Sequence, residues 1–243
     1  MSARNKVGIE AFVGAVCMLA FLASCKNTCS IEGIADASNI EGRTIRLKAV
    51  QPDGNWYVLD SCEVTHGSFS MACHFDSVLV TTLCIGEVPL MPVIVERGKV
   101  KVSITNLSLN ASGTPLNNEL YSFLDKKNEL DKQVADLGHA ESRMIMNGNS
   151  DYYIHHYVDS VYAVLSSDMQ DLVVGFIGDN YTNVLGLCGF SMLSNGLPYP
   201  VITPLIRSVL DKAPSSFLSN PIVSDFVKAA DANASRKDVA FSY

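Results

Sequence analysis

The sequence predicts an α+β protein in which an N-terminal antiparallel β-sandwich-like domain is followed by a C-terminal α-helical bundle. Between residues 30 and 106, apolar and polar residues alternate in short segments, as in strands with one buried and one wet face. From residue 116 onward the apolar residues recur at helical spacing. The change occurs over residues 112–115, so strands and helices are segregated along the chain.

A targeting segment precedes the predicted fold. Basic residues are followed by an apolar run over residues 11–23. The end of this run overlaps the motif Leu22-Ala23-Ser24-Cys25. As a helix the run would reach roughly 20 Å, short of the roughly 30 Å hydrocarbon core of a bilayer. The motif is similar to a bacterial lipobox, so we interpret residues 1–24 as a lipoprotein signal peptide. The alternative is an ordinary signal peptide that is cut elsewhere.

Cleavage before Cys25 would leave residues 25–29 as a lipidated N-terminus and short tether. Several acyl chains make a stable anchor, since each buried methylene contributes about 0.8 kcal/mol. No acidic residue follows Cys25 directly, which favours the outer membrane over the inner one. Lys26 lacks the acidic neighbours of a surface-export signal, so a periplasm-facing position is expected rather than cell-surface display.

Residues 30–111 are expected to form the β-sandwich-like domain, because short alternating segments are separated by frequent turn signals. The seven expected strands cover residues 31–34, 44–50, 56–59, 69–72, 78–80, 92–95 and 100–104.

Residues 112–243 are expected to form the helical domain. Thr114 suits the N-cap and Pro115 the first helical position, and either Gly138 or Gly148 would end the first helix. Further helices are expected over residues 152–177, 184–193, 203–210 and 222–230. The short connections between them favour antiparallel neighbours.

The formal net charge is −7. Removal of residues 1–24 takes away two positive charges and one negative charge, which leaves −8 on the mature chain. An acidic protein is repelled by nucleic acid and by anionic bilayer surfaces, so no nucleic-acid partner is expected.

Of the seven cysteines, five lie beyond the lipobox, and none forms a Cys-x-x-Cys motif. Cys62 and Cys73 fall on adjoining strands of an expected hairpin that turns near His66-Gly67. A cross-strand disulfide and two small buried hydrophobes are both open interpretations of this pair.

Several segments resemble a family of exported lipoproteins from anaerobic Gram-negative gut bacteria, named domain of unknown function 4369. They are Ile31-Glu32-Gly33-Ile34, residues 59–70, the strand-turn-strand of residues 92–102, and Ser112-Gly113-Thr114-Pro115-Leu116-Asn117-Asn118-Glu119-Leu120. The resemblance covers residues 30–124. Many relatives continue into a thioredoxin-like domain with Cys-x-x-Cys, which is missing here, so no thiol–disulfide activity carries over. The family supplies no catalytic residues for this segment.

Candidate chemistry is sparse, and no catalytic, cofactor-binding or metal-binding residue is assigned. Adjacent histidines such as His155-His156 point about 100° apart on a helix, so a solvated face is a better interpretation than a metal site. Trp56 is a candidate ligand contact, with a half-buried core position as the alternative. Tyr153 and Tyr157 share a helix face, which indicates either packing against the strands or an exposed partner site. Ser77 and Ser160 lie in Asp-Ser-Val triplets that resemble the O-glycosylation acceptor of exported proteins in these bacteria.

Together these features predict a membrane-anchored, non-enzymatic lipoprotein that needs no cofactor. It would contact the membrane through N-terminal acyl chains and bind either an envelope protein partner or a ligand between its two units. The alternative is an accessory or truncated relative of a periplasmic thiol–disulfide oxidoreductase.

Overall fold

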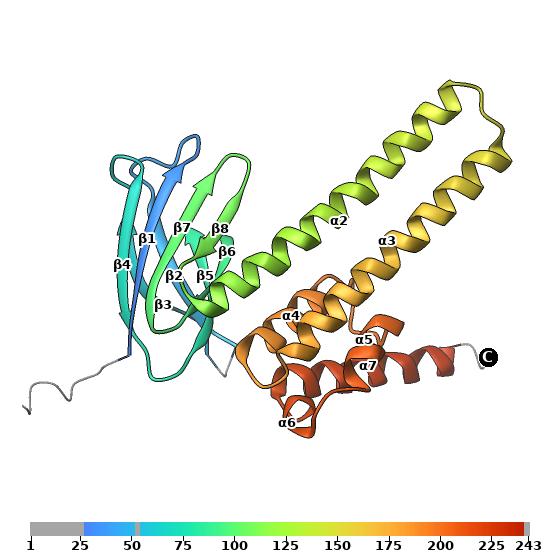
Figure 1. The fold of residues 1–243 in the computed structure, drawn as a ribbon. Helices are drawn as coiled ribbons and strands as arrows, with labels where there is room; N and C mark the ends of the chain where they lie inside the picture. The colour runs from blue at the N-terminus through green and yellow to red at the C-terminus, as the bar shows by residue number, and fades with distance from the viewer. Residues whose placement is uncertain (1–26, 52–53, 241–243) are drawn as a thin grey trace, which may run out of the picture.

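A computed structural model of the chain describes residues 27–51 and 54–240. Within them, eight strands form two four-stranded sheets and helices follow, so the predicted α+β class is confirmed (Figure 1). The N-terminal part is sandwich-like, with most of its strands antiparallel. Cys25 lies outside the described residues.

The first sheet has the strand order β4-β1-β7-β8. Its strands are β1 (Thr28–Asp36), β4 (Ser68–His74), β7 (Gly98–Thr105) and β8 (Leu109–Ser112). β1 pairs antiparallel with β4 and parallel with β7. Sequence analysis missed the four-residue β8, which is too short to show alternation.

The second sheet has the order β3-β2-β5-β6 and is antiparallel throughout. Its strands are β2 (Thr44–Val50), β3 (Trp56–Glu63), β5 (Leu79–Ile85) and β6 (Val88–Val95). The expected turn between β3 and β4 is present, and His66 and Gly67 both have positive φ there, 52° and 68°. The expected hairpin pairing is wrong, because β3 and β4 continue beyond this turn into different sheets.

The core lies between the sheets and continues under the helices. Alternate residues of β2, namely Ile45, Leu47 and Ala49, are buried, as period-2 patterning requires. Each fully buried aliphatic side chain contributes about 1.5–3 kcal/mol. Among the helices, Phe190 meets Phe217 and Phe226 edge-on, with ring centroids 6.0 and 5.5 Å apart.

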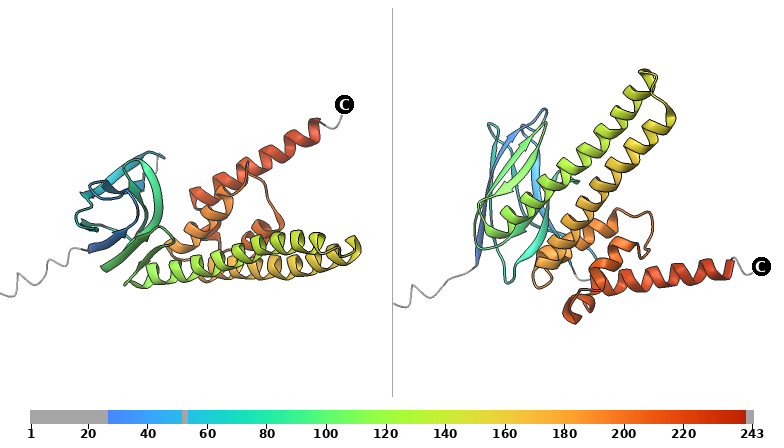
Figure 2. Two further views of the ribbon diagram at one scale, coloured as in Figure 1. Left: turned by 90° about the horizontal axis from the view of Figure 1, so that it is seen from above. Right: turned by 45° about the vertical axis from the view of Figure 1, so that its right-hand side comes forward.

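The helices begin with a long antiparallel pair, α2 (Pro115–Met146) and α3 (Asp151–Asp179). Figure 1 shows the far half of this pair projecting away from the sandwich; we call residues 131–165 the arm. Gly148, with φ of 74°, lies in the connection between them, as one of the two expected stops. The remaining helices pack at the base of the pair (Figure 2): α4 (Val184–Asn195), α5 (Pro204–Leu210), α6 (Ser215–Leu218) and α7 (Pro221–Ala240).

Candidate functional site

A buried polar cluster joins the sandwich to α2. Glu96 directly follows β6, and its Oε1 accepts hydrogen bonds from the backbone N–H groups of Leu116 (2.8 Å) and Asn117 (3.3 Å). These groups lie in the first turn of α2 and have no partner within the helix. A carboxylate also suits the positive end of the helix dipole. Thr114 occupies the N-cap position without a capping bond, so the expected role of its hydroxyl is wrong: Glu96 caps the helix instead.

Asn117 completes this cluster and is fully buried. Its Oδ1 accepts from the Ile94 N–H at 3.0 Å, and its Nδ2 donates to the Ile94 carbonyl at 2.8 Å and to Thr114 Oγ1 at 2.9 Å. One amide side chain thus pairs both backbone groups of Ile94 on the edge strand β6. This replaces the neighbouring strand that an edge lacks.

Gly113 brings the chain close to β7 at the same place. Its φ is 97°, and a Cβ there would lie 2.6 Å from the Lys99 carbonyl oxygen. Asn118 Oδ1 accepts from the Gly113 N–H at 2.9 Å. We call Glu96, Gly113, Thr114 and Asn117 the joint, because together they fix where α2 begins. Sequence analysis quoted Glu96 and Asn117 within motifs and assigned neither a role.

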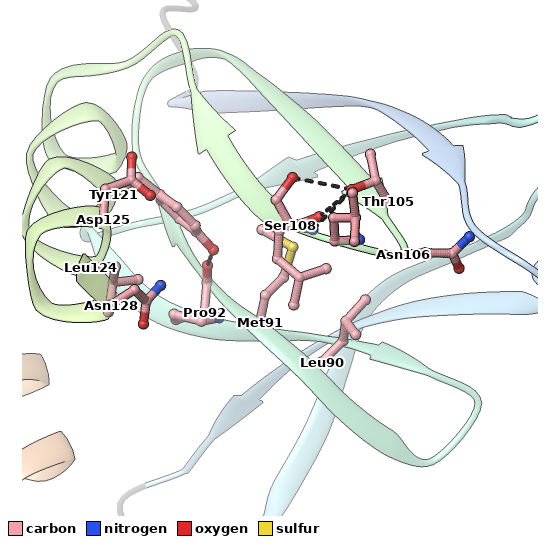
Figure 3. A pocket seen from close by; sticks show the side chains of 12 residues that line it. Leu90, Met91, Pro92, Thr105, Asn106, Ser108, Tyr121, Leu124, Asp125 and Asn128 are labelled. Carbon is pink, nitrogen blue, oxygen red and sulfur yellow. Dashed lines mark hydrogen bonds between the residues drawn. The ribbon is translucent and has the colours of Figure 1, made fainter. Parts of the chain in front are cut away.

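A pocket of about 490 Å³ lies where α2 crosses one open side of the sandwich, between β6 and β8. We call it the interdomain pocket (Figure 3). Its lining combines apolar and polar side chains: Leu90, Met91, Pro92, Thr105, Asn106, Leu107, Ser108, Leu109, Tyr121, Leu124, Asp125 and Asn128. Such a mixture suits a small organic ligand that is held by apolar contact and oriented by a few polar groups.

Tyr121 and Thr105 order the polar groups of this pocket. The Tyr121 hydroxyl donates to the Pro92 carbonyl at 2.8 Å. Burial raises the pKa of Tyr121, so its hydroxyl stays neutral. Thr105 Oγ1 lies 3.1 Å from Ser108 Oγ in the turn before β8. The Tyr121 hydroxyl is held by a backbone carbonyl and the Thr105 hydroxyl by its own turn, so both keep fixed positions from which they can orient a ligand.

A second pocket, of about 540 Å³, opens on the opposite side of the sandwich, between β3 and β4. We call it the edge pocket. It is lined by Tyr57, Val58, Leu59, Ala72, Cys73, His74, Phe75, Asp76, Ser77 and Leu79. Thr28 Oγ1 lies 3.3 Å from His74 Nδ1 at its rim. This pocket is more polar than the interdomain pocket, and it reaches a thiol.

Residues 29–120 match the family described as domain of unknown function (DUF4369). This segment is a DUF4369 domain. It runs from β1 into the start of α2, so it contains both sheets and the joint, and it confirms the resemblance over residues 30–120 of the expected 30–124. No curated protein matches the chain. The DUF4369 assignment therefore comes without an activity.

The motif 112–120 of the DUF4369 domain thus has a physical role. Gly113 allows the close approach to β7, Pro115 fits the first turn, and Asn117 pairs β6. These residues build the joint, which explains why this part of the resemblance is more distinctive than the strand patterns.

Trp56 lies at the start of β3, beside the edge pocket of the DUF4369 domain. Its side chain is 56% exposed, so the half-buried core position considered from the sequence is wrong. Its neighbour Tyr57 contributes to the pocket lining, but Trp56 is not among the lining residues, and successive side chains of a strand point to opposite faces. Trp56 remains a candidate ligand contact only as an exposed aromatic side chain near this edge of the sheet.

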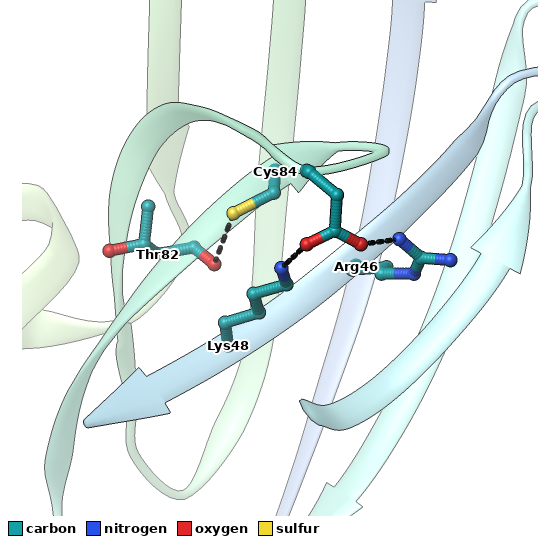
Figure 4. A network of polar contacts seen from close by, with 5 residues as sticks. Arg46, Lys48, Thr82 and Cys84 are labelled. Atoms are coloured by element: carbon teal, nitrogen blue, oxygen red, sulfur yellow. Dashed lines mark hydrogen bonds and ion pairs between the residues drawn. The ribbon is translucent and has the colours of Figure 1, made fainter. Parts of the chain in front are cut away.

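A network of charged residues crosses the outer face of the second sheet (Figure 4). Glu87 pairs with both Lys48 and Arg46, and the bond and charge of Lys48, then those of Arg46, lower the pKa of the Glu87 carboxyl. Cys84 Sγ donates to the Thr82 carbonyl at 3.8 Å, and burial raises the pKa of the Cys84 thiol. The cations are neutralised and the thiol stays protonated, so this network ties β2 to the β5–β6 turn.

The arm lies beyond the DUF4369 domain and exposes large apolar side chains. Tyr152 is 82% exposed and Met146 86%. Tyr153, Tyr157 and Val164 are exposed as well, and at about 100° per residue they lie within about 40° of one another on α3. Packing of Tyr153 and Tyr157 against the strands, considered from the sequence, is therefore wrong.

The remaining predicted residues lie apart from one another. Ser77 is exposed in the turn between β4 and β5, and Ser160 is exposed on α3, where its Oγ donates to the Tyr157 carbonyl at 2.8 Å. His155 and His156 are exposed, and the His156 ring stacks on Tyr152 with centroids 6.3 Å apart. Within residues 27–51 and 54–240, no three His, Cys, Asp or Glu side chains gather to hold a metal ion. None of the helices in this part of the chain is both long and apolar enough to cross a membrane.

The structure places Cys73 opposite Cys29, not opposite Cys62. Cys29 and Cys73 are register partners in the β1–β4 pair, whereas Cys62 belongs to β3 in the other sheet. All three are free thiols here. Cys73 and Cys29 are buried, and Cys62 is partly exposed.

Proposed function

We propose that the protein is a non-catalytic binding module of the cell envelope that contacts a partner protein through its arm. Acyl chains on Cys25 would hold it at the outer membrane, facing the periplasm. The observation that carries the proposal is the exposed face of Tyr153, Tyr157 and Val164, with Tyr152 and Met146 near the tip. Large exposed apolar groups of this kind mark interaction sites, and Tyr and Met are enriched at protein interfaces.

The position of the arm supports a protein partner over the bilayer. The tip of the arm lies far from the start of β1 in each view (Figures 1 and 2). α2 alone is about 48 Å long at 1.5 Å per residue. An anchor at Cys25, three residues before Thr28, would therefore direct the tip away from the membrane that holds it. Asp151 and Asp159 on the arm would also be repelled by anionic lipid.

Site-specific crosslinking tests this proposal. A photo-reactive amino acid at position 153 of the membrane-anchored protein is expected to give one discrete protein adduct in cells. The same amino acid at position 199, an exposed tyrosine away from the arm, is the matched control and is expected to give none. Equal adducts at both positions, or adducts to lipid alone at position 153, would refute a protein-binding arm. Cys25→Ser is expected to move the protein from the detergent phase to the aqueous phase.

The interdomain pocket supports a second candidate, a ligand held between the two units. Its lining comes from β6, from the β7–β8 turn and from α2, and it combines the polar groups of Asp125 and Asn128 with apolar Leu90 and Leu124. Native mass spectrometry of protein purified from membranes tests it: a bound small molecule should be lost in Leu124→Arg, which fills the pocket. Retention of the molecule in that variant would place it elsewhere.

A further inference from the structure

Cys29 and Cys73 stand directly across from each other in the antiparallel β1–β4 pair. Opposed residues of such a pair point to the same face of the sheet. Here that face is the sandwich interior, since Cys29 is 0% exposed and Cys73 is 5% exposed. The two thiols therefore face each other inside the DUF4369 domain.

The type of pairing sets their separation. The Phe75 N–H donates to the Asn27 carbonyl at 3.2 Å, two positions away along both strands. Because hydrogen-bonded and non-hydrogen-bonded pairs alternate, Cys29 and Cys73 form a hydrogen-bonded pair with Cα atoms about 5.5 Å apart. This lies within the range of about 4.4–6.8 Å found for disulfides. Their Cβ atoms, at about 5.5 Å, are farther apart than most disulfides allow, so a bridge would be strained and easy to reduce.

The surroundings of the two sulfurs are unequal. Cys73 belongs to the wall of the edge pocket and is 5% exposed, whereas Cys29 is 0% exposed. A hydrogen bond from the Cys73 thiol lowers the pKa of the Cys29 thiol, while the same bond and burial raise the pKa of Cys73. In a bridge, Cys73 is the sulfur that an incoming thiolate reaches, and Cys29 is the better leaving group.

We propose that Cys29 and Cys73 form a reversible disulfide that exchanges with external thiols and disulfides through Cys73 in the edge pocket. To form it, Cys73 must first lose its proton, which its raised pKa makes slow. The Cys73 thiolate then attacks a low-molecular-weight disulfide, which leaves Cys73 in a mixed disulfide and releases one thiolate. The Cys29 thiolate then attacks the Cys73 sulfur, closes the bridge and expels the second thiolate. The two protons lost by the cysteines pass to the two released thiolates, so the external disulfide is reduced by two electrons.

Glutathione buffers test this with the full chain carrying Cys62→Ala, because Cys62 is the partly exposed thiol among the cysteines in residues 27–51 and 54–240. After equilibration with glutathione disulfide, alkylation and peptide mass mapping are expected to show a Cys29–Cys73 link, which mild reductant opens. In Cys29→Ser, Cys73 is expected to carry one stable glutathione adduct. In Cys73→Ser, Cys29 is expected to stay unmodified, because its side chain is 0% exposed.

Circular dichroism of each variant shows whether it remains folded. The parent chain, which carries only Cys62→Ala, keeps both Cys29 and Cys73, so the test for the disulfide itself does not depend on a variant of the pair being folded. Complete alkylation of Cys73 after oxidation of the folded parent chain would overturn the proposal. Equal glutathione adducts on Cys29 and Cys73 in the two single variants would overturn the assignment of Cys73 as the exchanging sulfur.

Discussion

Asn117→Ala is expected to destabilise the protein strongly at the joint. Asn117 makes three buried hydrogen bonds, two of them to the backbone of Ile94 on the edge strand. Alanine would leave the Ile94 N–H and carbonyl without partners and away from water. Each orphaned buried group costs about 1–3 kcal/mol, so the expected loss for the two is about 2–6 kcal/mol.

The neighbouring residue supplies a matched control. Asn118 is exposed and makes one hydrogen bond, in which it accepts from the Gly113 N–H at 2.9 Å. Water replaces this partner when Asn118 becomes alanine, so we expect a loss below about 1 kcal/mol. Both substitutions remove the same side chain from adjacent positions of one helix turn and differ mainly in burial.

Urea unfolding followed by far-ultraviolet circular dichroism measures the difference. Fluorescence is a poor probe, because the single Trp56 is already exposed in the folded chain. At about 2–4 °C of Tm per kcal/mol for a chain of this size, a loss of about 2–6 kcal/mol is expected to lower the Tm of Asn117→Ala by about 4–24 °C. Equal midpoints for Asn117→Ala and Asn118→Ala would refute the conclusion that the Asn117 amide pairs the edge of β6.

Other expectations concern turns and modification. Gly113→Ala should lower the free energy of unfolding by about 2–4 kcal/mol, because positive φ is combined with a backbone clash. Gly148→Ala should lower it by only about 1 kcal/mol, because positive φ occurs there in open space. Urea unfolding midpoints of the two variants measure the difference. Two backbone N–H groups of the β3–β4 turn lower the pKa of Glu41, so its stabilisation is complete above the unfolded value near 4.5 and is lost as the pH falls through the folded value. Glu41→Gln should flatten this acid dependence, and a parallel shift at every pH would contradict it. If the mature protein carries hexose-type additions, we expect them on Ser77, which lies in an exposed turn, rather than on Ser160, which lies within a helix. Intact mass spectra of Ser77→Ala should then lack these additions, and additions that remain in this variant would favour Ser160.

The local elements could be predicted because their signals are local. Alternation placed β2 at its observed bounds, and Pro115 marked the first turn of α2. The Glu96 cap of that helix could not be predicted from local sequence. Glu96 precedes Leu116 by 20 residues, and its carboxylate meets the start of α2 only when β6 and the helix are packed together. Thr114 does occupy the expected N-cap position, but the capping hydrogen bonds come from Glu96.

Strand partners were the other unpredictable feature. Cys62 and Cys73 flank one turn in the sequence, and a hairpin would have paired their strands. In the fold, β1 takes the place beside β4, so Cys73 meets Cys29 instead. The parallel β1–β7 pair has the same non-local character. The exposure of Tyr153 also depended on tertiary structure, since periodicity shows that residues share a face but not what that face meets.

The joint links the two candidate binding surfaces because α2 lines the interdomain pocket and then pairs with α3 to form the arm. The joint fixes the first turn of α2, Tyr121 in the next turn bonds β6, and the same helix continues into the arm. Loosening the joint by Asn117→Ala should therefore disturb the interdomain pocket and the direction of the arm together. Tyr153→Ser changes the arm alone, because Tyr153 lies on α3 and is not among the residues that line the pocket. A function lost in both variants belongs to the arm, and one lost only in Asn117→Ala belongs to the pocket.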